Sequence, residues 1–121
     1  MCLDKYKYFK LPENGIGYKV FVKIGDDEYR PPFFGHEFRL NEWIHDEREF
    51  KIEYENDDNR YYPTGFHVFT NFADAQTYRG NVAGDGLVVR KVEFKNVVTR
   101  GLQDKCKCIV CRSLKILKEG E

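Results

Sequence analysis

The alternation of hydrophobic and polar positions is clearest between residues 65 and 69, where it predicts a short buried strand. Phe66 and Val68 flank the polar His67, which is the two-residue period of a pleated strand. The period then changes, because apolar side chains recur every three residues and would share one face of a helix. The three positions are Phe72, Ala75 and Tyr78. The pattern therefore predicts a strand that turns directly into a helix of about two turns.

Polar residues and a glycine mark the ends of this helix, which we expect at about residues 71–79. Thr70 or Asn71 can cap the first turn, and Asp74 follows Asn71 by three residues in a variant of the capping box. Gly80 offers the left-handed conformation that commonly ends a helix. The first amides of the helix, at residues 71–73, could also receive a phosphate.

Shorter alternating runs elsewhere predict further strands. Between residues 18 and 24, the apolar set Tyr18, Val20, Val22 and Ile24 alternates with Lys19, Phe21 and Lys23. Similar patterns occupy residues 33–40, 50–54, 87–98 and 106–117. Pro31 and Pro32 cannot donate to a ladder, so the segment around them lies at an edge or leaves the sheet.

These elements predict a single α+β domain over residues 1–121. We expect a curved, mostly antiparallel or mixed sheet of about six or seven strands with one short helix. Hairpin-linked strands argue against a doubly wound parallel sheet. Residues 1–16 and 118–121 are expected to be irregular.

The amino-acid composition is typical of a folded domain and does not favour nucleic acid as a partner. Of 121 residues, 41% are apolar and 16% aromatic, which is enough to bury a core without staples. Twenty basic and twenty acidic residues give no net charge, so no overall field favours nucleic acid. No apolar run is long enough to cross a bilayer or act as a signal peptide, so we expect a cytoplasmic protein.

The four cysteines allow two interpretations. Cys106, Cys108 and Cys111 fall within six residues, which is poor spacing for a disulfide framework. A structural zinc needs four ligands, so Cys2 or a distant histidine would have to complete the set. We favour the alternative, a buried strand that uses cysteine as a small hydrophobic residue. No metal or other cofactor is expected.

Candidate contact residues lie in two aromatic segments and in the strand before the helix. The segment 29–39 combines arginine, histidine and aromatic side chains. Such a mixture can bind a nucleotide, because the aromatic rings stack on the base and the basic side chains pair with the phosphate. It equally suits an edge strand covered by its own aromatics, which we favour. His67 is a further candidate, although a neutral histidine bonded inside the core is the commoner outcome. The candidates are Arg30, His36, Arg39, Tyr61, Tyr62 and His67.

No catalytic constellation is readable in the chain. The sequence contains no nucleophile–histidine–acid pattern, glycine-rich phosphate loop or paired metal-binding histidines. We therefore predict a protein that binds rather than one that catalyses.

Several short motifs resemble a set of small proteins from phages, prophages and their bacterial hosts. The matching stretches are residues 1–3, 17–21, 29–33, 65–69 with Asp74 and Ala75, 88–93 and 113–116. The resemblance implies a viral or mobile-element accessory protein. Small phage proteins of this size often inhibit host defence, in an anti-CRISPR-like manner, by binding a defence protein or a nucleotide signal.

The strand–helix–strand piece is also similar to part of the ADP-ribosyltransferase fold. The usual histidine or arginine entry that grips the dinucleotide has no counterpart around residues 18–23, and Glu93 alone is typical of a solvated strand face. Our leading hypothesis is a non-enzymatic inhibitor that binds a host defence protein. The alternatives are a nucleotide-signal sponge and an ADP-ribosyltransferase-like enzyme.

Overall fold

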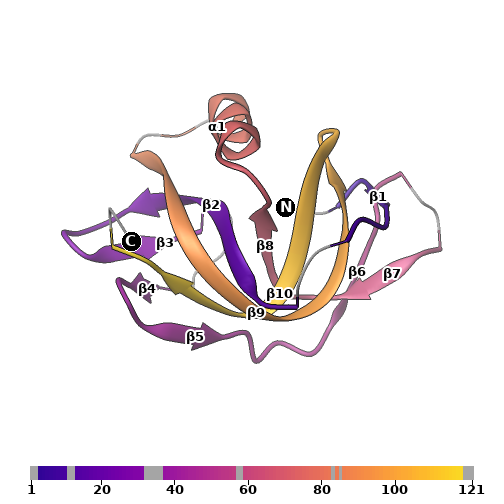
Figure 1. Ribbon diagram of the computed structural model, residues 1–121, viewed down its shortest axis with the longest axis horizontal. Helices are drawn as coiled ribbons and strands as arrows, with labels where there is room; N and C mark the ends of the chain where they lie inside the picture. Colours follow the sequence, from indigo (N-terminus) through magenta and orange to yellow (C-terminus); the bar gives the residue numbers. More distant parts are fainter. Residues whose placement is uncertain are drawn as a thin grey trace.

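The computed structural model describes residues 3–10, 13–31, 37–56, 59–82, 84 and 86–118. It contains a curved antiparallel sheet and one helix (Figure 1), which confirms the predicted fold class. The elements are β1 (Lys5–Tyr6), β2 (Gly15–Lys23), β3 (Glu28–Arg30), β4 (Phe38–Arg39), β5 (Trp43–His45), β6 (Lys51–Glu53), β7 (Tyr61–Pro63), β8 (Phe66–Phe69), α1 (Phe72–Asn81), β9 (Leu87–Gln103) and β10 (Cys106–Ile116).

Among the described residues the sheet has eight strands, which is more than the six or seven expected. Its order is β1-β9-β10-β8-β2-β3-β4, with β5 also paired to β10, while β6 and β7 form a separate two-stranded ribbon. Part of the N-terminal segment expected to be irregular is extended, because β1 pairs with β9 and β2 already begins at Gly15. The alternating pattern does not predict β1 or the first three residues of β2, because two-residue and glycine-containing segments carry little alternation.

The long strand β9 organises the fold by pairing with two different strands. Its first half, residues 87–94, lies against β2, and residues 92–103 lie against β10. Strand β8 in turn pairs with β10 and, through Phe69 opposite Tyr18, with β2. The strands β9, β10, β8 and β2 therefore close into a ring.

A bulge interrupts the pairing of β9 with β10. Val110 lies opposite Thr99 and Cys111 opposite Val97, so the register skips Val98 on β9. Nearby Asn96 has a φ of 61°, and its side-chain amide donates to the Ser113 hydroxyl at 2.9 Å. Asparagine tolerates this left-handed backbone better than most residues, and a bulge increases local twist. Figure 1 shows the resulting strong curvature of β9 and β10.

Gly17 allows β2 and β8 to meet where the ring closes. A Cβ atom at this position would lie 2.5 Å from a Val68 methyl carbon and 2.8 Å from the Phe69 carbonyl oxygen. Neither distance is sterically possible, so only glycine fits without displacement of β8.

The core occupies both faces of β2. On one face Phe21, Phe38 and Phe66 pack edge to face, with ring centroids 5.2–5.4 Å apart. On the other face Val20 packs with Phe69 under α1. The alternation predicted for residues 18–24 therefore does not divide a buried face from a solvated one, since Lys19 and Phe21 are buried and Ile24 is exposed.

Helix α1 lies over β2, β8 and β9 and begins as predicted. Asn71 is its cap, with its side-chain oxygen accepting from the Asp74 amide at 2.9 Å. Ala75 and Tyr78 are buried against the sheet, but Phe72 is half-exposed. The prediction for Gly80 was wrong, because the helix continues through it to Asn81 and ends at Val82 in extended conformation.

No helix among the described residues is both long and apolar enough to span a membrane.

Candidate functional site

The six candidate residues separate into exposed and interior groups. Arg30 and Arg39 are exposed on β3 and β4, where the Arg39 guanidinium lies 3.8 Å from the Glu28 carboxylate. Tyr61 is 55% exposed on β7, and His36 lies outside the described residues. Tyr62 and His67 are buried at 2% and 5% exposure. His67 therefore does not share a surface with Arg30 and Arg39.

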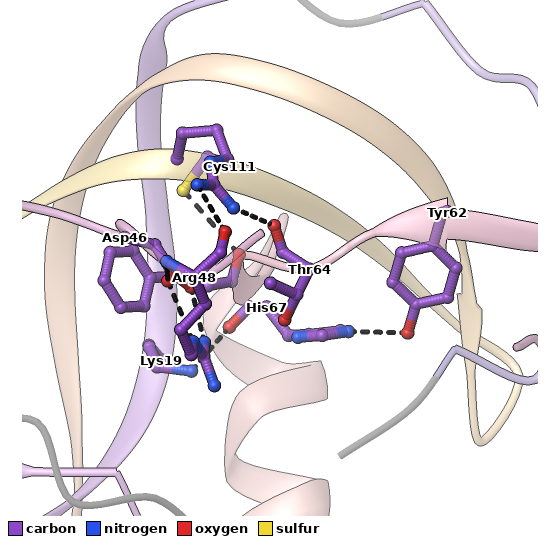
Figure 2. A network of polar contacts seen from close by, with 9 residues as sticks. Lys19, Asp46, Arg48, Tyr62, Thr64, His67 and Cys111 are labelled. Atoms are coloured by element: carbon purple, nitrogen blue, oxygen red, sulfur yellow. Dashed lines mark hydrogen bonds and ion pairs between the residues drawn. The ribbon is translucent and has the colours of Figure 1, made fainter. Parts of the chain in front are cut away.

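Tyr62 and His67 are the only two of the described candidates that the structure brings into contact. The Tyr62 hydroxyl lies 2.9 Å from His67 Nε2 (Figure 2) and accepts a hydrogen bond from the Leu3 amide, also at 2.9 Å. The hydroxyl oxygen can accept a second bond, so which group donates between Tyr62 and His67 follows from the tautomer of the histidine ring. Lys19 completes this side of the network by donating from Nζ to the His67 carbonyl oxygen at 2.9 Å.

Burial sets the charge of both basic groups in this network. It lowers the pKa of His67 well below 6.5, with the nearby Lys19 cation acting in the same direction and a backbone hydrogen bond to Gly65 opposing it. Burial also lowers the pKa of Lys19 to about 8. His67 is therefore neutral at physiological pH, as expected of a core histidine. Nothing in the alternation of residues 18–24 signalled that Lys19 would be buried.

A second branch of the network fastens residues 46–48 to β10. Arg48 Nε donates to the buried Asp46 carboxylate at 2.8 Å, and a second guanidinium nitrogen contacts its other oxygen. Arg112 donates to the carbonyl oxygens of Thr64 at 2.6 Å and Arg48 at 2.8 Å. Burial alone would raise the pKa of Asp46, but the hydrogen bonds and charge of Arg48 outweigh it and hold the pKa below its usual value. Figure 2 shows both branches of the network. Because Lys19, Asp46 and His67 are buried, we assign the network to the scaffold.

Two cysteines belong to the core. Cys108 and Cys111 are fully buried in hydrophobic clusters, and burial raises the pKa of each thiol to about 12. This confirms the interpretation of these two as small hydrophobic residues. Cys106 is partly exposed. Within the described parts of the chain, no three histidine, cysteine or acidic side chains gather as a metal site would require.

A surface that the sequence did not predict lies between α1 and the start of β9. Two adjoining hollows, of about 270 and 210 Å³, share Phe72, Val89 and Arg90 in their walls. We call them together the basic groove. Its complete lining among the described residues is Tyr18, Lys23, Tyr29, Phe72, Gln76, Arg79, Val88, Val89, Arg90, Lys91, Leu117 and Lys118.

The basic groove concentrates positive charge beside aromatic rings. Its cations are Lys23, Arg79, Arg90, Lys91 and Lys118, and none of its described lining residues is acidic. Positive side chains gathered in one place attract an anionic ligand. Since the whole chain is neutral, this local excess is a feature of the folded surface rather than of composition.

Contacts with the backbone hold the two arginines of the basic groove in place. Arg90 donates to the Leu117 carbonyl oxygen at 3.0 Å, and its guanidinium lies 5.4 Å from the centre of the Tyr29 ring. Arg79 donates to the Leu87 carbonyl oxygen at 3.4 Å. Phe72 is 49% exposed, and its ring meets Tyr18 edge to face at 5.7 Å. The groove thus offers oriented cations and an accessible ring.

The sequence carried only weak signals for this groove. Phe72, Gln76 and Arg79 are spaced to share one helix face, but the apolar spacing of the helix predicts that Phe72 lies on the core face. Arg90 and Lys91 lie on a predicted strand, where a pair of cations is typical of a solvated face. The groove needs five separate segments to meet, namely β2, β3, α1, β9 and the residues after β10, which a local pattern does not reveal.

No protein-family model matches this chain, and no curated protein or solved structure is significantly similar to it.

The Tyr62 hydroxyl should contribute measurably to stability. Tyr62→Phe leaves the Leu3 amide and His67 Nε2 without this partner, so the free energy of unfolding in urea should fall by about 1–3 kcal/mol. Tyr61→Phe, its exposed neighbour, should change it by less than about 0.5 kcal/mol. Equal losses in the two variants would contradict the proposed role of the network.

Buried Lys19 should make stability depend on pH in a defined window. Between its folded pKa of about 8 and the ordinary value of 10.5, the unfolded chain binds a proton that the folded chain does not. The free energy of unfolding of the wild type should therefore rise relative to Lys19→Met by up to about 3 kcal/mol from pH 8 to 10.5.

Denaturation of both proteins at several pH values would measure this difference. Groups near Lys19, namely His67, Arg48, Cys108 and Cys111, are present in both proteins, so the comparison isolates the lysine. A wild-type advantage over Lys19→Met that does not change with pH would contradict a buried, destabilised ammonium group.

Proposed function

We propose that this protein is a non-enzymatic binding protein that captures a nucleotide in the basic groove. The observation that carries the proposal is the gathering of five cations and an exposed phenylalanine around two adjoining hollows of a neutral chain. A nucleotide combines the two complementary features, since it carries phosphates for the cations and a flat ring for the aromatic side chain.

The chemistry of the groove supports affinity rather than turnover. Its described lining offers lysine, arginine, tyrosine, glutamine and apolar side chains. Charge-assisted hydrogen bonds contribute about 1.5–3 kcal/mol each, and stacking of a base contributes about 1–3 kcal/mol. After the cost of association, a few such contacts correspond to a dissociation constant in the micromolar range.

This proposal favours one of the hypotheses drawn from the sequence, the nucleotide-signal sponge. In that setting, the protein of a phage or mobile element would lower the concentration of a nucleotide that activates host defence. The phage or mobile-element origin is inferred from the sequence resemblance, whereas the nucleotide-binding site is inferred from the basic groove.

Inhibition through a direct contact with a defence protein is the second candidate. It is favoured by the ribbon of β6 and β7, where Tyr61 and the preceding Phe50 expose about half of their side chains. Such exposed aromatic side chains commonly anchor protein interfaces. A complex formed through this ribbon would not depend on the cations beside α1.

Charge reversal in the groove separates these proposals. In calorimetry with ATP at low salt, Arg79→Glu should weaken binding at least about tenfold, or about 1.4 kcal/mol, because it removes a cation and adds a repelling charge. Arg39→Glu changes a matched exposed arginine outside the groove and should alter the affinity less than about twofold. Equal effects of the two reversals, or no heat with the wild type, would contradict nucleotide capture.

A further inference from the structure

The basic groove has two basic ends rather than one. Lys23 and Arg79 line only the larger hollow, at the end where β9 begins. Lys91 and Lys118 line only the smaller hollow, next to the end of β10. Phe72 and Arg90 line both hollows. They therefore lie between the two pairs of cationic side chains.

The dimensions of the groove argue that one hollow holds only part of a ligand. Pockets for small molecules commonly enclose about 300–1,000 Å³, and each hollow is smaller than that. Along α1, Phe72 and Arg79 are separated by seven residues, or about 10 Å of helix. The basic end formed by Lys23 and Arg79 is thus about the length of one nucleoside away from the Phe72 ring. The other basic end, formed by Lys91 and Lys118, lies on the far side of that ring.

A mononucleotide carries its phosphates at one end of the nucleoside and would neutralise one basic pair only. A dinucleotide with a 5′-terminal phosphate has one phosphate group on each side of its first nucleoside. Its charge distribution matches that of the groove, where a central ring and a shared arginine separate two pairs of cations.

We propose that the basic groove is a dinucleotide site, in which one phosphate meets Lys23 and Arg79, the other meets Lys91 and Lys118, and the base between them stacks on Phe72. This inference rests on the proposed nucleotide-binding function. It adds that binding requires both hollows at once. Arg90 is held by Leu117 and Tyr29 and lines both hollows, so it would contact the ligand beside the stacked base.

Calorimetry with three probes tests this proposal. The 5′-phosphorylated dinucleotide pApA and ADP carry similar charge, and inorganic tripolyphosphate carries charge without a ring. Wild-type protein should bind pApA at least about tenfold more tightly than ADP, because only pApA reaches both basic ends. Phe72→Ala should weaken both nucleotides and leave tripolyphosphate unchanged.

Variants at the two ends provide the sharper comparison. Arg79→Ala and Lys118→Ala should each weaken pApA by about three- to tenfold, whereas ADP should respond to only one of them. Lys51→Ala, which removes an exposed lysine on the separate ribbon, should leave every affinity unchanged. Matching melting temperatures would establish that these exposed substitutions leave the fold intact.

The outcomes distinguish this inference from the proposed function. If ADP and pApA bind equally well, or if one end variant leaves pApA binding unchanged, nucleotide capture stands and the two-ended site is overturned. If none of the probes binds the wild type, both proposals are overturned.

Discussion

The bend of β9 is the constraint on which the other features of this protein depend. One strand pairs with β2 through residues 87–94 and with β10 through residues 92–103, and its register with β10 skips Val98 beside the left-handed Asn96. The bend brings β2 and β10 to the two sides of β8 and closes the ring. It also places the start of β9 beside α1 and the end of β10, where the basic groove forms.

The closed ring explains why glycine, phenylalanine and histidine occur at positions 65–67, where the sequence pattern of the chain is clearest. A Cβ at Gly65 would lie 2.6 Å from the Cys111 carbonyl oxygen, so glycine permits β8 to lie against β10. Phe66 fills the core, and His67 satisfies the Tyr62 hydroxyl inside it. A buried histidine and lysine cost desolvation energy, and their hydrogen bonds offset part of that cost. This motif therefore specifies the scaffold, and the binding surface lies elsewhere.

Local patterns predicted what depends on neighbouring residues. Strand β8, the start of α1 with its Asn71 cap, and the burial of Cys108 and Cys111 all follow from short-range periodicity and residue type. The pairing of β9 with two strands and the burial of Lys19 depend on segments tens of residues apart, so no window of the sequence contains them. The basic groove was missed for the same reason. Its cations are scattered from Lys23 to Lys118 and resemble ordinary solvated positions until the fold brings them together.

Native-state hydrogen exchange tests the central role of this bent strand most directly. If ring closure by β9 holds the fold together, amides of residues 87–94 paired with β2 and of residues 97–103 paired with β10 should open in one cooperative unit with the same free energy. An opening of the first half at a free energy lower by about 2 kcal/mol or more, with the second half still protected, would contradict this account.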